Sequence, residues 1–247
     1  MIRGLITTNR NLHILEKKQE NLSTSVANLN TAGYKEQEII QSTLLEQNLF
    51  NRLNGPELNQ QLEVGGLPLG NQIDEVYRDF SQGGIQLTNS STDLAIQGDA
   101  FFTVETGAGE VMYTRNGNFT VDAEGFLATQ DGNRVLSTTN DPIQVGSMEF
   151  TVSNNGTVIE TGQQLQLTTF ADPAGLTSTG DTLFAGNGGV MTGDSVVLQS
   201  AIEGANTNTA DVMVDLMQIS REFEANQKIL QAADQTLQKA VNELGKV

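Results

Sequence analysis

The sequence contains no cysteine, no tryptophan, one histidine and four prolines in 247 residues. The absence of cysteine excludes disulfide scaffolds, thiolate metal sites and cysteine nucleophiles. No apolar run approaches the roughly 20 residues that a membrane-spanning helix needs, and the first residues lack the pattern of a secretory signal. A formal net charge of −17 disfavours nucleic acid as a partner, since phosphate contacts need clustered cations. We therefore expect a chain that neither spans a membrane nor binds nucleic acid.

Residues suited to catalysis are equally scarce. His13 lies in a helical segment without a second histidine to share a metal ion, and the sequence contains no Gly-x-Ser-x-Gly motif for a nucleophilic serine. The acidic turns at residues 122–125 and 131–133 resemble fragments of calcium loops, but neither completes the ligand series. The sequence predicts no enzymatic activity, no cofactor, no metal site and no small-molecule substrate.

The acidic charge is concentrated in the middle of the chain. Residues 1–50 hold five cationic and five acidic side chains, and residues 201–247 hold four and seven. Residues 51–200 hold four cationic and eighteen acidic side chains, which leaves −14 on this segment. The two ends are therefore close to neutral, and the middle is strongly acidic.

Both ends show the periodicity of a long helix. Residues 5–32 contain no glycine or proline, and a heptad of apolar positions predicts an N-terminal helix within residues 1–32 that stops at Gly33. The expected seam residues there are Leu5, Leu12, Leu15, Leu22, Val26 and Leu29.

The C-terminal periodicity is longer and predicts a helix within residues 206–247. Asn208 or Thr209 is the expected cap, and Asp211 favours the helix dipole in the first turn. A helix of about 36 residues is ~54 Å long at 1.5 Å per residue, so it must pack against something long. Its expected seam residues are Val212, Leu216, Ile219, Phe223, Leu230, Leu237 and Leu244.

The middle of the chain has a different pattern. Short β-favouring runs alternate with Gly, Asn, Asp and Ser, and no helical period is present between residues 85 and 199. This pattern predicts a β-rich body over residues 73–200, with an extended arm or linker over 33–72. The pairs Asn116-Gly117 and Asn155-Gly156 predict hairpin turns. The predicted strands lie at residues 85–87, 93–97, 101–106, 111–114, 118–121, 126–129, 134–136, 148–152, 157–160, 165–170, 182–184 and 196–199.

Together these elements predict an α+β fold in which a central all-β domain is flanked by long terminal helices that pair as a coiled coil. Two interpretations of the seams remain open: the helices pack only on each other, or they also present a seam to neighbouring subunits. The second is favoured because the C-terminal seam outlasts the N-terminal one. Polar Gln19 and Asn226 lie within the seams, where a polar residue can fix register and partner number.

Three blocks of the sequence resemble the flagellar rod and hook proteins of the bacterial axial structure. The first, Ala-Asn-Leu-Asn-Thr-Ala-Gly-Tyr-Lys at residues 27–35, contains Asn28, Thr31, Gly33, Tyr34 and Lys35 of the family motif. The second comprises residues 93–102, 113–119 and 122–127, beginning Asp-Leu-Ala-Ile-Gln-Gly. The third comprises residues 203–208, 213–217 and 221–226, beginning Glu-Gly-Ala-Asn. The blocks keep the family's order over nearly the whole chain.

The resemblance implies a structural subunit of the flagellar basal-body rod. Such a subunit is exported through the flagellum's own apparatus, polymerises helically with itself and other axial proteins, transmits torque and conducts later subunits. Residues 167–184 favour the distal rod type, with a proximal rod or hook-type subunit as the alternative. A secreted β-rich enzyme or binding protein is a remote alternative from another class. The expected location is the rod of the basal body, where it crosses the periplasm and cell wall.

Overall fold

The computed structural model describes residues 2–44, 46–52, 61–68, 70–193 and 195–244. The chain divides into two compact units, which we call the helix–ribbon unit (residues 1–24, 38–77 and 210–247) and the β-body (residues 25–37 and 78–209). Met1, residues 53–60 of the predicted arm, Leu69 and residues 245–247 of the predicted C-terminal segment lie outside the described residues.

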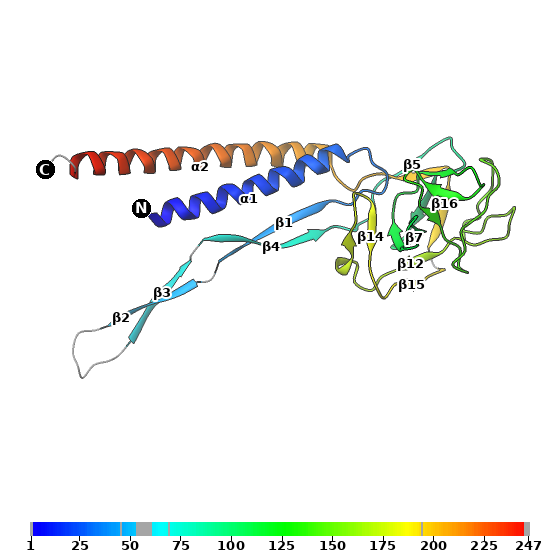
Figure 1. The fold of residues 1–247 in the computed structure, drawn as a ribbon, viewed down its shortest axis with the longest axis horizontal. Coiled ribbons are helices and arrows are strands. Elements are labelled where there is room, and N and C mark those ends of the chain that lie inside the picture. The colour runs from blue at the N-terminus through cyan, green and yellow to red at the C-terminus, as the bar shows by residue number, and fades with distance from the viewer. Residues whose placement is uncertain (1, 45, 53–60, 69, 194, 245–247) are drawn as a thin grey trace. The chain divides into compact units, whose positions relative to one another are not determined.

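The helix–ribbon unit contains the two helices and four strands, all labelled in Figure 1. Helix α1 spans Ile2–Ala27 and helix α2 spans Thr209–Leu244, with Asp211 in the first turn of α2. Strand β1 (Gln37–Thr43) pairs with β4 (Asn71–Arg78), and β2 (Glu46–Arg52) pairs with β3 (Gln61–Pro68). Both helices are predicted by the sequence, but the four strands of this unit are not among the predicted strands, which begin at residue 85.

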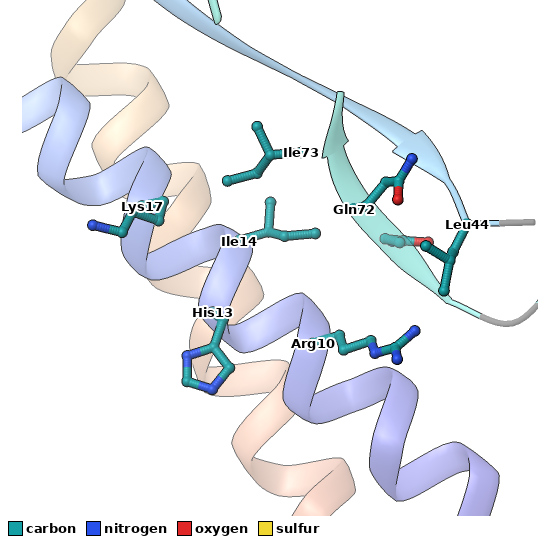
Figure 2. Close-up of a pocket in the computed structure, with 8 residues that line it drawn as sticks. Arg10, His13, Ile14, Lys17, Leu44, Gln72 and Ile73 are labelled. Atoms are coloured by element: carbon teal, nitrogen blue, oxygen red, sulfur yellow. The ribbon is translucent and has the colours of Figure 1, made fainter. Parts of the chain in front are cut away.

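The predicted coiled coil is wrong. The two helices share no run of close backbone contacts of the kind that a paired seam makes along its length, within the described residues. The reason is visible in α1: Ile14, which is outside the predicted seam, is 4% exposed, whereas Val26 of the seam is 41% exposed. Ile14 points towards Ile73 of β4 (Figure 2), so the apolar surface of α1 is divided between more than one neighbour. The α+β description holds only as two long helices with a mainly β central region.

The β-body is built around strand β7 (Phe101–Glu105), which pairs with three others. Its partners are β8 (Val111–Thr114), β11 (Arg134–Val135) and β12 (Leu167–Thr169), all antiparallel. The sheet continues from β8 to β14 (Leu183–Ala185) and β13 (Thr177–Ser178), and from β11 to β10 (Leu127–Thr129) and β9 (Phe119–Val121). Strand β15 (Val190–Met191) pairs with β12.

Two further pairs complete the β-body. Strand β6 (Leu94–Gln97) pairs with β16 (Val196–Gln199), and β5 (Ile85–Leu87) pairs with β17 (Ala201–Glu203). A short 3₁₀ turn, η1 (Pro173–Gly175), is capped by the Asp172 side chain. The predicted strands at 85–87, 111–114 and 196–199 coincide with β5, β8 and β16.

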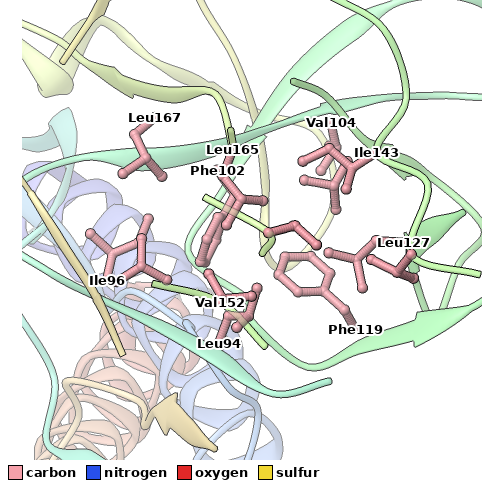
Figure 3. Packing of buried hydrophobic residues seen from close by; sticks show 14 of the residues in the cluster. Leu94, Ile96, Phe102, Val104, Phe119, Leu127, Ile143, Val152, Leu165 and Leu167 are labelled. Carbon is pink, nitrogen blue, oxygen red and sulfur yellow. The ribbon is translucent and has the colours of Figure 1, made fainter. Parts of the chain in front are cut away.

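The hydrophobic core lies on one face of β7 and gathers side chains from most of the sheet (Figure 3). Phe102 is fully buried and meets the Phe119 ring edge-on at 5.1 Å between centroids. Phe101, the next residue along β7, points to the opposite face and contacts Phe80, Phe170 and Phe184. Because successive side chains of a strand alternate in direction, this aromatic pair fixes β7 between two apolar layers.

The two Asn-Gly pairs behave differently. Asn155-Gly156 forms a tight turn, in which the Gly156 N–H donates to Ser153 and Gly156 has φ of +79°. Asn116-Gly117 is not a hairpin turn, because β8 and β9 on either side of it do not pair. Gly117 instead packs against the start of β6, where a Cβ atom would stand 1.6 Å from the Leu94 carbonyl oxygen. The glycine is needed there for close backbone approach rather than for a turn.

Candidate assembly site

The turn that follows α1 carries the first family-like motif. Asn28 accepts hydrogen bonds from Thr31, through its backbone carbonyl at 3.0 Å and its side-chain oxygen at 2.9 Å. Gly33 has φ of +68°, and a Cβ atom there would lie 2.3 Å from the carbonyl carbon of Arg115. Both the backbone conformation and the available space therefore require glycine. The turn is thus seated directly on the backbone that follows β8.

Tyr34 and Gly33 fasten this turn at two further points. The Tyr34 hydroxyl lies 3.3 Å from the Ser25 hydroxyl in the last turns of α1, and both side chains are buried. The Gly33 N–H donates to the backbone carbonyl of Glu203 in β17 at 2.8 Å. The segment leaving α1 and the segment approaching α2 are therefore joined by backbone as well as by side chains.

A buried ion cluster lies beneath the turn, formed by Lys35, Arg115 and Glu203. The Lys35 ammonium donates to Glu203 Oε1 at 2.7 Å and to the Ser81 carbonyl at 2.6 Å. Arg115 Nη1 donates to Glu203 Oε2 at 3.2 Å. None of the three side chains is more than 1% exposed, so this is a fully desolvated group of two cations and one anion. Additional hydrogen bonds are what make such a group tolerable in a protein interior.

The charged groups of this cluster have further partners. The Gly83 N–H donates a second hydrogen bond to Glu203 Oε1 at 2.9 Å, and the Arg115 guanidinium lies 4.8 Å from the centre of the Phe101 ring. Burial lowers the pKa of the Lys35 ammonium below its usual 10.5, and the attraction of Glu203 opposes that shift. Burial likewise lowers the pKa of Arg115. Glu203 is therefore the group on which both cations depend.

Asn206 joins three segments of backbone just before α2. Its side-chain oxygen accepts from the Glu36 N–H at 2.7 Å, and its amide nitrogen donates to the Asp79 carbonyl at 2.8 Å. Its own N–H donates to the Tyr34 carbonyl at 3.4 Å. We call Gly33, Tyr34, Lys35, Arg115, Glu203 and Asn206 the junction cluster. Within the β-body it joins the segment that follows α1 to the segment that precedes α2.

The sequence predicts only part of this cluster. Gly33, Tyr34 and Lys35 belong to the family-like motif, and all three are buried. Arg115, Glu203 and Asn206 are not among the predicted site residues, although each lies inside a block that carries the resemblance. The available signal was the position of these polar residues within those blocks.

The predicted seam residues are covered to different degrees. In α1, Leu15 is buried, Leu5, Leu12 and Leu22 are half-buried and Val26 is exposed, while Leu29 lies half-buried in the turn after the helix. In α2, Val212 and Ile219 are buried. Leu216, Phe223, Leu230 and Leu237 are half-buried, and Leu244 is the last residue of the helix. The seam of α2 thus becomes less covered beyond Ile219.

A second group of apolar side chains is exposed near the start of α2. Met213 is 58% exposed, Val214 55% and Met217 54%. A 36-residue helix that leaves its seam half-covered and a further apolar group uncovered is typical of a surface that receives other chains.

Two family models match the chain in succession. The flagellar hook protein FlgE/F/G D1 domain matches residues 95–160, and the flagellar basal body rod FlgEFG protein C-terminal region matches residues 198–243. The flagellar basal-body rod protein FlgG of Buchnera aphidicola subsp. Schizaphis graminum is 30% identical over 97% of this chain and 98% of its own length. FlgG of Borreliella burgdorferi is 31% identical over 96% of this chain and 97% of its own length.

The chain belongs to the flagellar basal-body rod protein family. A further relative, the flagellar hook-basal body complex protein FlhO of Bacillus subtilis, is 29% identical over the full length of both chains. The junction cluster of this rod-family chain draws on both matched regions: Arg115 lies in the first, and Glu203 and Asn206 lie in the second. The cluster therefore ties the two family regions to the motif that follows α1.

Within the described ranges no group of three or more His, Asp or Glu side chains is arranged to hold a metal ion. His13 pairs with Glu16 of its own helix, 3.1 Å away. Neither described helix is both long and apolar enough to cross a membrane.

Proposed function

We propose that this chain is a distal-type subunit of the flagellar rod that polymerises helically through its terminal helices. Its membership of the rod protein family places it in the basal body as a structural component of the motility apparatus. The carrying observation is the similarity to FlgG proteins over nearly the whole length of both chains. The junction cluster supports the proposal, because within the β-body it joins the segment that follows α1 to the segment that precedes α2.

In this proposal the role of the chain is mechanical. Torque transmission requires a body that keeps its shape under load. Within the β-body, the junction cluster meets this need with buried ion pairs and with hydrogen bonds that join the segments 33–36, 79–83 and 203–206. The chain then needs no catalytic residue, cofactor or small-molecule substrate; its partners are copies of itself, other axial proteins and the flagellar export apparatus.

The proposal separates the two parts of the chain by function. The half-covered seams of residues 1–32 and 206–247 form the packed inner layer, and the acidic body over residues 73–200 forms the outer wall, joined by the arm over 33–72. Heterologous contacts that do not close on themselves produce a helical polymer. Near-neutral ends suit surfaces that stack against their own copies, and an acidic body suits a solvated exterior.

Electron microscopy of basal bodies from a strain lacking the gene tests this function. The expected result is assembly that stops before the distal rod and hook, with loss of swimming. Full-length chain restores both, whereas chains lacking residues 1–30 or 209–247 are expected to restore neither. Complete rods in the deletion strain, or rods built from a truncated chain, would overturn the proposal.

A proximal rod or hook-type position is the second candidate. The similarity to FlhO supports this candidate, because the name of FlhO refers to the hook-basal body complex as a whole. The same micrographs separate the candidates by the point at which assembly stops: before any rod, after a short rod, or after a complete rod without a hook.

A further inference from the structure

A groove of about 320 Å³ lies between α1 and the β1–β4 ribbon, within the helix–ribbon unit. Its floor is apolar: Ile14 of α1 faces Ile73 of β4, with Leu44 after β1 at one end (Figure 2). Its α1 side carries Arg10, His13 and Lys17. An apolar floor beside cationic side chains fits a partner that brings acidic groups at matching positions.

The cations Arg10 and Lys17 lie on one stripe of α1 together with Ile6 and His13. These four residues are spaced by four, three and four positions, which places them within about 60° of one another on a helix. All four are exposed, and Ile6 is 47% exposed. Lys17 pairs with Glu20 and His13 with Glu16 on the same helix. Four cations against two acids still leave α1 with a formal charge of +2.

Helix α2 carries a stripe of opposite sign. Asp211, Asp215, Glu222 and Ile229 are spaced by four, seven and seven residues, which places them within about 40° of one another. All are exposed, and Ile229 is 56% exposed. Six acids against three cations give α2 a formal charge of −3. This stripe is separate from the half-buried seam.

The two stripes match in spacing. Arg10 and Lys17 are seven residues apart, as are Glu222 and Asp215, so both pairs span about 10 Å along a helix. In an antiparallel arrangement Arg10 meets Glu222 and Lys17 meets Asp215. Ile6 and Ile229 then fall at the same end of the contact. Gln218, midway between the two acids, would lie over the groove.

We propose that the groove between α1 and the β1–β4 ribbon receives the acidic stripe of α2 from a second copy of this chain. This inference rests on the proposed function, because it names the surfaces through which copies of a rod subunit meet. Opposite charges at matched spacing give register and partner choice more than affinity. Exposed pairs of this kind are screened by salt, so the contact weakens as ionic strength rises.

Charge reversal on each stripe tests the proposal in a strain lacking the gene. Variant A carries Arg10→Glu and Lys17→Glu, and variant B carries Asp215→Lys and Glu222→Lys. In A alone two acidic stripes face each other, and in B alone two cationic ones do. Each alone is expected to reduce the number of rod-bearing basal bodies by about tenfold or more. When A and B are produced together, each altered stripe can meet an altered partner, and rods are expected to return.

The mixed strain distinguishes contact between copies from contact within one chain. If the stripes met only within a chain, mixing A with B would restore nothing, although a single chain carrying all four substitutions would. A control variant with Lys18→Glu and Glu224→Lys changes the same charge types on other faces of the helices and is expected to assemble normally. Export of A and B into the medium, with circular dichroism spectra like the parent chain, shows that they fold.

Failure to restore rods in the mixed strain, or a control as defective as A and B, would overturn the groove proposal. Neither result would touch the proposed function if the deletion strain still lacks rods and the parent chain restores them. If the deletion strain builds complete rods, the proposed function fails first.

Discussion

Replacing Glu203 by glutamine is the sharpest test of the junction cluster. The amide keeps the shape of the side chain and can still accept from Lys35 and the Gly83 N–H through one oxygen. At the other position an NH₂ group would face Arg115 Nη1, which stood 3.2 Å from a carboxylate oxygen. The cluster changes from a net charge of +1 to +2 without a counter-ion, in a region where none of the three side chains is more than 1% exposed.

Removing one partner of a buried ion pair typically costs about 3–5 kcal/mol, because it leaves an uncompensated charge. We expect E203Q to lower the free energy of unfolding of the β-body by that amount. A domain of this size loses roughly 2–4 °C of melting temperature per kcal/mol, so the expected loss is about 6–20 °C. Such a loss is a large share of a total stability of about 5–15 kcal/mol.

Lys35→Met provides the decisive comparison. It removes the surplus cation and leaves Arg115 and Glu203 as a one-to-one pair, although the Ser81 carbonyl loses its donor at a cost of about 1–3 kcal/mol. Because E203Q leaves two buried cations unpaired and K35M leaves a one-to-one ion pair, E203Q must lower the free energy of unfolding more than K35M does. In the double variant the two costs must not add, because the sites share one hydrogen-bond network.

Urea unfolding of the purified chain, followed by circular dichroism, measures these differences. Glu149→Gln is the matched control, since it makes the same chemical change at an exposed position of the β-body. Its expected effect is within about 0.5 kcal/mol of zero. An E203Q effect as small as that of the control, or a K35M effect larger than that of E203Q, would refute the account of the cluster as cations that depend on one carboxylate.

Three further outcomes are expected. Gly33→Ala forces φ of +68° on an alanine and sets its Cβ against the Arg115 backbone, so it should cost more than about 1–3 kcal/mol in urea unfolding; a neutral effect would contradict the required close approach. Burial lowers the pKa of Lys35 in the folded chain below the 10.5 of the unfolded chain. At a pH between the folded and the unfolded pKa the unfolded chain binds more protons, so the free energy of unfolding should rise with pH in that range. This rise should vanish in Lys35→Met. Backbone hydrogen bonds, led by that from the Phe126 N–H, lower the pKa of Asp122 below 3.8. The turn that Asp122 holds is therefore stabilised above pH 3.8 and loosens as the pH falls through the lowered pKa. In Asp122→Asn, hydrogen exchange in this turn should no longer show this loosening in acid.

The helices were predictable because their signals are local. The apolar heptads and the acidic Asp211 in the first turn of α2 lie within the helices themselves. The end of α1 was predicted less well: the helix ends at Ala27, six residues before the Gly33 that was expected to stop it. The surface on which a helix packs is not encoded in the same way. Ile14 lies outside the heptad seam yet is buried, because the β1–β4 ribbon covers that side of α1. The coiled coil was inferred from α1 and α2 alone, without the strands that compete for the same apolar surface.

Whether a strand could be predicted from the sequence depended on how deeply it is buried. Strand β7 has four buried residues, three of them apolar, and the sequence pattern identified it within one residue. Strands β1 and β4 were missed, because β4 is mostly exposed and gives no alternation of apolar and polar positions. Strands β1 and β4 pair through backbone hydrogen bonds between segments some thirty residues apart, and amino-acid composition does not reveal such a pairing.

The junction cluster shows the same limit at the level of single residues. Lys35 lies in a recognisable motif, but its carboxylate partner is 168 residues away. Eighteen acids in residues 51–200 and seven beyond them were equally eligible from the sequence. What selects Glu203 is the pairing of β17 with β5, which brings its side chain to the Gly83 N–H and to both cations.

The buried cations also affect how the surface charge of the chain should influence assembly. Of the four cations in residues 51–200, Arg115 is buried against Glu203 and Arg134 is engaged by Asp122 and Glu124. The acids that face water on the β-body therefore meet little positive charge, and two such bodies repel each other at low salt. The proposed contact between α1 and α2 has the opposite dependence, because salt weakens the attraction of their stripes. Raising the salt should thus relieve repulsion between bodies while it loosens the helical contact. The sign of the salt effect on assembly consequently reports which surface limits it: if the helices carry the contact, assembly weakens with salt, and variants A and B lose that dependence when each is tested alone.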